Sequence, residues 1–315
     1  MTDSERQLRC AVVGGAGAVG QMFTSLLTTA GTHVCTVDTA PHPDVSQNPA
    51  PHYLQGDITA PDGRLRTELS DVDVVLLAVP ESVALRAVPV LADLVRPDAL
   101  LVETLSVKSS FNEVVRRHAP AHQAVGLNPM FAPSLGLPGR AVAAVVHHHG
   151  PLAARLLELV RRGGGRVVAV DAAEHDRLAA ASQALTHAAV LAFGSALAEL
   201  GVDVDTLCAV APPPHTVMLA LLARISSGTP EVYWDVQAGN PLASEARSAL
   251  AAGLQRLDGL TAPGSTSTAE ADFAAELSRI RTALGGRLDD YAQLCTSLFA
   301  RLPQPSRAPG GGSSC

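Results

Sequence analysis

Short apolar segments alternate with amphipathic segments over the first half of the chain. The stretch "DVDVVLLAVP", residues 71–80, is apolar between its Asp and Pro boundaries, which predicts a strand buried on both faces of a parallel sheet. Similar runs predict strands at 8–13, 33–38, 99–106, 124–129, 141–149 and 165–171. Strand and helix patterns in alternation predict a parallel sheet with helices on both faces.

In the second half of the chain, the apolar residues recur with the period of a helix. Residues 172–200 contain almost no helix breakers. Further helical segments are predicted at 215–227, 240–257, 267–285 and 287–301. We therefore expect an α/β Rossmann-type domain over 1–171, an all-α substrate and dimerisation domain over 172–303, and a disordered tail over 304–315. Long apolar helices need partners, which favours a homodimer through the C-terminal helices.

The composition limits which partners and which cellular compartment are expected for this chain. The formal net charge is −7, so neither nucleic acid nor an anionic membrane is expected as the main partner. No apolar run reaches about 18 residues, and the polar N-terminus lacks the apolar core of a signal peptide. The 5 cysteines form no C-x-x-C pair, which favours reduced thiols in a cytoplasmic protein.

A glycine-rich loop follows the first predicted strand and opens a helix. Gly15, Gly17 and Gly20 give the G-x-G-x-x-G pattern of a dinucleotide site, in which the helix N-terminus faces a pyrophosphate. The predicted cofactor-binding residues are Gly15, Ala16, Gly17, Ala18, Val19, Gly20, Asp38, Val79 and Pro80. Asp38 ends the next strand, where it would accept hydrogen bonds from a ribose and repel a 2′-phosphate. NAD is therefore favoured over NADP; FAD and a glycine turn without a ligand are the alternatives.

Candidate chemistry lies at the carboxyl ends of the predicted strands, where doubly wound sheets bind substrates. "TLSVKSS" carries Ser106 and Lys108, and "GLNPMFAPSLG" carries Asn128. Lys108 is the only lysine of the chain, and a compact ammonium is not interchangeable with arginine. The helical half adds "EHD" at 174–176, His187 and Arg224.

A histidine on an apolar helix is more often part of a core, and a helical arginine is more often solvated. From the residues alone, the sequence predicts an NAD-dependent dehydrogenase with an anionic substrate. Three adjacent histidines, His147 to His149, predict an exposed turn rather than a metal site, because neighbouring positions of a strand face opposite ways. No metal site is expected.

The motifs "SVK", "NPMFAP", "EHD", "QALTH" and "LLARI…VYWDV" follow the glycine loop in order. Over about residues 8–300 the chain resembles the prephenate and arogenate dehydrogenase family. The resemblance implies a Rossmann-type domain, a helical dimerisation domain, and NAD-dependent oxidative decarboxylation of a cyclohexadiene dicarboxylate. It also implies that Arg224 binds a substrate carboxylate. Ser106, Asn128, His187 and Lys108 are the other predicted substrate-binding residues, and Asn128, Ser106 and His187 are the predicted catalytic residues.

Asn128 departs from the family pattern, which has His-Pro-Met where this chain has "NPM". The resemblance implies that this histidine accepts the proton of the C4 hydroxyl as hydride leaves. An amide cannot take a proton near neutral pH, and losing a general base costs about 10²- to 10⁴-fold in rate.

A C4 amine would remove the need for a base, because its lone pair expels hydride and leaves a weakly acidic iminium. We therefore expect Asn128 to bind the amine of 4-amino-4-deoxyprephenate, as in specialised family members of antibiotic biosynthesis. The alternative is an ordinary prephenate or arogenate dehydrogenase. A non-catalytic NAD-binding regulator and a reductase of an unrelated anion are further alternatives. Neither a fused chorismate mutase nor a tyrosine-sensing domain is expected, so feedback inhibition by tyrosine should be weak.

Overall fold

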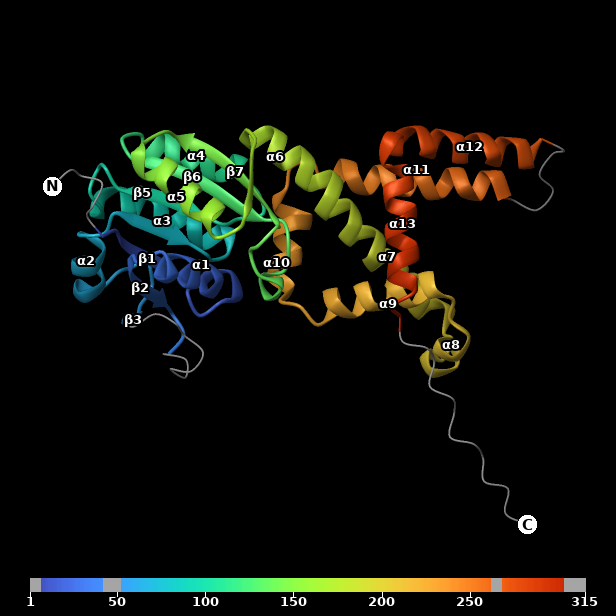
Figure 1. The fold of residues 1–315 in the computed structure, drawn as a ribbon, viewed down its shortest axis with the longest axis horizontal. Coiled ribbons are helices and arrows are strands. Elements are labelled where there is room, and N and C mark those ends of the chain that lie inside the picture. Colours follow the sequence, from blue (N-terminus) through green and yellow to red (C-terminus); the bar gives the residue numbers. More distant parts are fainter. Residues whose placement is uncertain (1–6, 42–51, 262–267, 303–315) are drawn as a thin grey trace, which may run out of the picture. The chain divides into compact units, whose positions relative to one another are not determined.

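The computed structural model describes residues 7–41, 52–261 and 268–302, and its first half is built on one sheet (Figure 1). The strand order is β3-β2-β1-β4-β5-β6-β7-β8. The strands are β1 Arg9–Val13, β2 His33–Asp38, β3 His52–Gln55, β4 Val74–Leu77, β5 Leu100–Glu103, β6 Gln123–Pro129, β7 Ala141–His148 and β8 Arg166–Ala169. The strands predicted from the apolar runs are confirmed, while β3 was not predicted.

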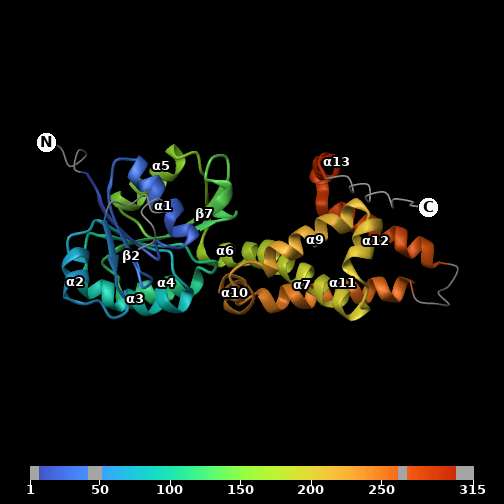
Figure 2. The ribbon, with the colours of Figure 1, turned by 90° about the horizontal axis from the view of Figure 1, so that it is seen from below.

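Helices cover both faces of the sheet. They are α1 Ala18–Thr29, α2 Gly63–Leu69, α3 Glu81–Leu94, α4 Ser109–His118 and α5 Pro151–Arg162. Figure 2 shows α1 and α5 on one side and α2, α3 and α4 on the other. The side chains of β4 alternate between the two resulting cores, since Val75 packs with Leu91 and Leu76 packs with Phe23. Burial on both faces explains why this strand is apolar throughout.

One predicted feature of the sheet is wrong. Strands β1 to β6 are parallel, but β7 pairs with β6 in antiparallel fashion. A parallel connection needs a crossover long enough for a helix, and the connection between β6 and β7 contains only the 3₁₀ turn Pro133–Leu135. Strand β8 follows α5 and pairs with β7 in parallel. The α/β fold class is confirmed, with a sheet that is mostly parallel.

The chain divides into two compact units. The sheet unit comprises residues 1–183 and 234–243, and the helical unit comprises residues 184–233 and 244–315. The predicted boundary after residue 171 is therefore too early, because α6, Ala172–Ala179, belongs with the sheet. His175 and Asp176 on this helix bond to residues of the sheet unit, which accounts for its placement. The predicted tail lies outside the described residues.

The helical unit contains α7 Leu185–Leu200, α8 Val204–Val210, α9 Pro213–Ser226, α11 Ala243–Thr261, α12 Ala269–Leu284 and α13 Leu288–Phe299. The short helix α10, Pro230–Trp234, precedes a π-helical turn. The predicted helices are confirmed, and α8 and α10 were not predicted. A π-helical turn at Ala180–Ala184 joins α6 to α7. This run, Ala172–Leu200, is by length and composition long and apolar enough to cross a membrane, although its first turns carry buried polar side chains.

Candidate active site

The loop between β1 and α1 is shaped by glycines. Gly14 has a φ of 78°, a left-handed conformation that favours glycine. A Cβ at Gly20 would lie 2.7 Å from the Cα of Gly15, so glycine is needed for the helix to start this close to the loop. The backbone N–H of Ala16 donates to Asp38 Oδ2 at 2.9 Å. The acidic end of β2 therefore fixes the loop, and Gly14 is a structural requirement that the motif pattern missed.

A cleft of about 510 Å³ lies at the carboxyl ends of β1, β2 and β4. Of the predicted cofactor residues, Ala16, Gly17, Asp38, Val79 and Pro80 line it. The other four predicted residues do not line the cleft. A Cβ on Gly15 would collide with Thr36, and Gly20 packs against the loop. Ala18 and Val19 are the first residues of α1. Sequence reasoning missed the lining residues Gly14, Thr39, Asp57, Thr59 and Arg86.

A buried ion pair lies at the end of β5. Lys108 Nζ is 2.7 Å from Glu103 Oε2, and both side chains are fully buried. The ammonium also donates to the carbonyl oxygen of Leu105 at 2.7 Å. Burial lowers the pKa of Lys108, and the negative charge of Glu103 opposes this effect.

The predicted substrate contact of Lys108 stays a prediction, and the structure shows its ammonium held by groups of its own chain. Its ammonium is bound inside the sheet unit and closes the turn that carries Ser106. Ser106 itself is half-buried on this turn, so its prediction as a site residue stays open. The glycine at 126 on the neighbouring strand leaves space for the pair, because a Cβ there would collide with Glu103.

Asn128 lies at the carboxyl end of β6 and is 3% exposed. Its Nδ2 is 3.1 Å from Nε2 of His175. His175 Nδ1 is in turn 2.9 Å from Oδ1 of Asp176. The "EHD" segment of the sequence therefore meets the "NPM" turn inside the sheet unit, although no role had been assigned to either residue of this His-Asp pair.

Asp176 links His175 to the turn that follows β5. Its two carboxylate oxygens accept hydrogen bonds from the backbone N–H groups of Lys108 and Ser109, at 2.8 and 3.0 Å. Asn240 donates to the backbone oxygen of Asp176 at 2.8 Å. Burial raises the pKa of Asp176, but the hydrogen bonds from His175, Ser109 and Lys108 outweigh it and hold the pKa below its usual range. The carboxylate is thus ionised at neutral pH.

The helical unit brings together two other predicted residues. His187 on α7 is half-buried, and burial, assisted by the charge of Arg224, lowers its pKa. Its ring packs edge-on against Tyr233, with centroids 5.0 Å apart. Arg224 on α9 is exposed and forms no ion pair with any other described residue. A neutral imidazole beside a free guanidinium suits an anionic ligand.

The three consecutive histidines do not form the expected exposed turn. His147 and His148 end β7 and the side chain of His147 is fully buried, whereas His149 follows the strand and is exposed. His147 Nδ1 bonds with Asn112 Oδ1 at 3.1 Å, and its Nε2 is 3.6 Å from Glu103 Oε1. His148 bonds instead with the backbone oxygen of His122. Neighbouring rings face different ways, as a strand requires, but the first ring belongs to the buried charge cluster.

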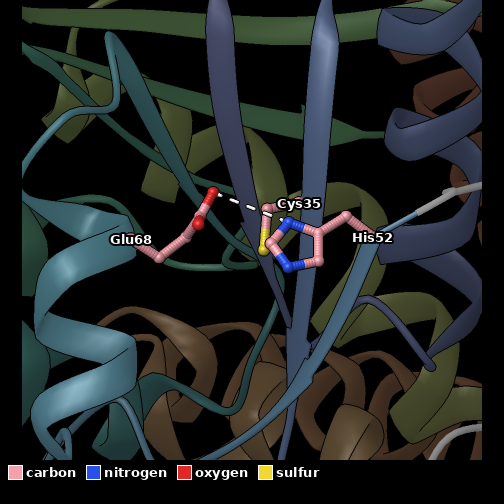
Figure 3. Close-up of side chains that lie close together, drawn as sticks. All are labelled: Cys35, His52 and Glu68. Carbon is pink, nitrogen blue, oxygen red and sulfur yellow. Dashed lines mark ion pairs between the residues drawn. The ribbon is translucent and has the colours of Figure 1, made fainter.

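Figure 3 shows a second group of potential metal ligands, Cys35, His52 and Glu68. His52 Nδ1 is 3.7 Å from Glu68 Oε1, which is an ion-pair contact. Arg9 also approaches the same oxygen, at 3.8 Å. Burial raises the pKa of the Cys35 thiol to about 12, so the thiol stays protonated. Arg9 and His52 share the same oxygen of Glu68, which makes these side chains an ion-pair cluster.

A glycine loop at the first βα turn, an acid at the end of the second strand and polar groups at the next strand ends define a dinucleotide-binding oxidoreductase. Comparisons with known proteins agree. Residues 55–145 match the family model of the prephenate dehydrogenase nucleotide-binding domain. The chain is 51% identical over 294 residues to a 4-amino-4-deoxyprephenate dehydrogenase of Streptomyces pristinaespiralis, covering 93% of this chain and 97% of the relative.

More distant relatives support the same assignment. The T-protein of Enterobacter agglomerans is 31% identical, over 71% of this chain and 55% of its own length. The crystal structure of a prephenate dehydrogenase from A. aeolicus, in complex with hydroxyphenyl propionate and NAD⁺, shares the fold with a TM-score of 0.65 and 18% identity, covering 90% of this chain and 100% of that one. The chain therefore belongs to the prephenate dehydrogenase family.

Proposed function

We propose that this chain oxidises 4-amino-4-deoxyprephenate to 4-aminophenylpyruvate, with NAD⁺ as the hydride acceptor and with loss of CO₂. The observation that carries the proposal is the buried amide of Asn128 at the carboxyl end of β6. The relative that is 51% identical over 93% of this chain carries the name of this activity. Ordinary prephenate or arogenate dehydrogenation is the second candidate.

The reaction balances without a base at Asn128. The lone pair of the neutral C4 amine expels hydride to NAD⁺ and leaves an iminium cation. Loss of CO₂ from C1 returns an electron pair to the ring, which becomes an aniline. With a C4 hydroxyl, the corresponding cation is a protonated ketone, a much stronger acid, and a base that shares its proton accelerates the step.

The neighbour of Asn128 does not replace that base. His175 Nε2 is a basic nitrogen, but it lies 3.1 Å from the amide nitrogen of Asn128, and the N–H of this amide occupies the lone pair of Nε2. An amine substrate therefore suits the site better than a hydroxyl substrate. The cleft beside Asp38 would hold the adenosine ribose of NAD⁺, because a carboxylate disfavours a 2′-phosphate.

The substrate carboxylates require cations, and Arg224 is the side chain we assign to one of them. Its guanidinium is exposed and lies in the helical unit with His187. A planar fork binds a carboxylate through two hydrogen bonds. Ser106, on the turn after β5, is assigned to the C4 side of the substrate. Arg224→Lys should raise KM while kcat changes less, because a lysine provides charge without the fork.

The proposal includes a cytoplasmic homodimer. The described cysteines Cys10, Cys35, Cys208 and Cys295 are all free thiols, as in a reducing compartment. Helices α11, α12 and α13 expose large apolar side chains in the single chain. These residues are Leu254, Leu257, Phe273, Leu277, Ile280, Leu284, Tyr291, Leu294 and Leu298. A second copy would cover them.

The test of the function is NADH formation with prephenate and with 4-amino-4-deoxyprephenate, for the wild type and for Asn128→His. We expect the amine to be preferred by the wild type and Asn128→His to gain activity on prephenate. Asn128→Gln, which keeps an amide but lengthens the side chain, is the matched control and should not gain it. Faster turnover of prephenate by the wild type would overturn the proposal, and stoichiometric CO₂ excludes a simple reductase.

A further inference from the structure

A chain of hydrogen bonds inside the sheet unit ends at Asn128. It begins at the backbone N–H groups of Lys108 and Ser109, which donate to the carboxylate of Asp176. It continues over 2.9 Å to His175 Nδ1 and over 3.1 Å from His175 Nε2 to Asn128 Nδ2. The three side chains are between 1% and 3% exposed, so water does not compete for these bonds.

The chemistry of the groups gives every bond a direction. An ionised carboxylate only accepts, so the Nδ1 of His175 must carry a proton and donate to Asp176. The amide nitrogen of Asn128, which only donates, lies 3.1 Å from Nε2 of His175. Nε2 therefore accepts this hydrogen bond, and Nδ1 carries the only ring proton. The amide oxygen, Oδ1, must consequently face away from His175.

We infer that His175 and Asp176 are positioning residues, which turn the amide of Asn128 so that Oδ1 is offered to the C4 amine of the substrate. This inference rests on the proposed function. No residue in the described ranges donates a hydrogen bond to Oδ1, and this acceptor is therefore available to a ligand. An amine N–H is the complementary donor.

Without this pair the amide would lose its preferred orientation. The two orientations of an amide have nearly the same shape, and packing distinguishes them poorly. The turned amide would present its N–H groups to the amine, and two donors would face each other. The hydrogen bond to His175 thus fixes the orientation of the amide, so that its oxygen, an acceptor, faces the substrate. His175 and Asp176 are adjacent on α6, and both bond to other residues of the sheet unit.

The kinetic test is a double-mutant cycle with Asn128→Ala, His175→Ala and the double variant. His175→Ala should lower kcat/KM for 4-amino-4-deoxyprephenate by about tenfold and leave NADH binding unchanged. Because His175 acts through Asn128, the double variant should be no slower than Asn128→Ala alone. Independent, multiplying losses would overturn the inference. His122→Ala is the matched control, since this imidazole is also buried but has no hydrogen-bonded ring nitrogen among the described residues.

A second measurement needs neither substrate nor turnover. Nitrogen-15 NMR of the wild-type histidine rings, with His175→Gln used for assignment, should show His175 neutral and protonated on Nδ1. Protonation on Nε2, or on both nitrogens, at neutral pH would overturn the inference. If the enzyme prefers prephenate while the NMR result holds, the proposed function fails and the orientation of the amide stands.

Discussion

The two units of the molecule treat their apolar residues in opposite ways. The sheet unit buries them in two cores, one on each face of the sheet. In the described part of the helical unit, the buried apolar residues are Ala184, Val190 and Ile225. Nearly all of its large apolar side chains are exposed or only partly buried in the single chain. The sheet unit therefore buries its apolar residues within one copy, whereas the helical unit leaves exposed the apolar side chains that the proposed dimer would cover.

The units also differ in their use of charge. The sheet unit contains a fully buried ion pair, Lys108 and Glu103, and a buried carboxylate, Asp176. The ion pairs of the helical unit are at the surface, such as Arg287 with Asp290. Buried charges are costly when they lose a partner, while exposed charges are screened by water. The most sensitive positions of the chain should consequently lie in the sheet unit.

The largest expected effect is the loss of the buried ammonium. Lys108→Met keeps the side-chain volume but leaves the carboxylate of Glu103 without its counter-charge. Breaking one side of a buried pair costs about 3–5 kcal/mol of unfolding free energy, which urea denaturation would measure. Adding Glu103→Gln should recover much of the loss. Arg117→Met, which breaks the exposed pair with Glu113, is the control; an equal loss there would contradict the contrast between buried and exposed charge.

The second effect concerns the exposed face of the helical unit. Phe273, Leu277, Ile280 and Leu284 recur at helical spacing on α12. A Leu277→Asp/Ile280→Asp variant should weaken dimerisation by about 10³-fold, because a two-fold interface carries every charge twice. Sedimentation measures the association constant. Thr282→Asp, on the opposite side of the same helix, should leave it unchanged. A wild type that is monomeric at micromolar concentration would refute the proposed dimer.

These contrasts show which features could be predicted from the sequence. The glycine loop and Asp38 were predictable, because a pyrophosphate imposes fixed spacing on short local segments. The reversed strand β7 was not, since its apolar run resembles the others and only the missing crossover helix distinguishes it. The departure at Asn128 was visible because a resemblance supplied the expected residue.

The partners of the site residues were harder to predict. Lys108 stood out as the only lysine of the chain, but its partner Glu103 lies within an apolar strand, where no pattern marks it as an ion-pair residue. The link from Asn128 to His175 spans 47 positions of sequence and depends on the placement of α6 beside the sheet. Local periodicity contains no information about such contacts, so it did not indicate that Lys108 forms a buried ion pair.

The smallest effect is a pH dependence that separates the two units. Hydrogen bonds from His175, Ser109 and Lys108 lower the pKa of the buried Asp176 despite its burial. A carboxyl group with a depressed folded-state pKa stabilises the protein above its unfolded-state pKa, and this stability is lost as pH falls through the folded-state value. The difference in unfolding free energy between wild type and Asp176→Asn should thus be largest near neutral pH and shrink below about pH 4.

Asp203 in the helical unit provides the matched comparison. Hydrogen bonds from Thr206 also lower its pKa, but its carboxylate is exposed to solvent at the start of α8. An asparagine is an equally good residue at a helix N-terminus, and water screens the charge that is removed. Asp203→Asn should therefore change stability little at any pH. If its difference from the wild type varied with pH as strongly as that of Asp176→Asn, burial in the sheet unit would not be the source of the acid sensitivity.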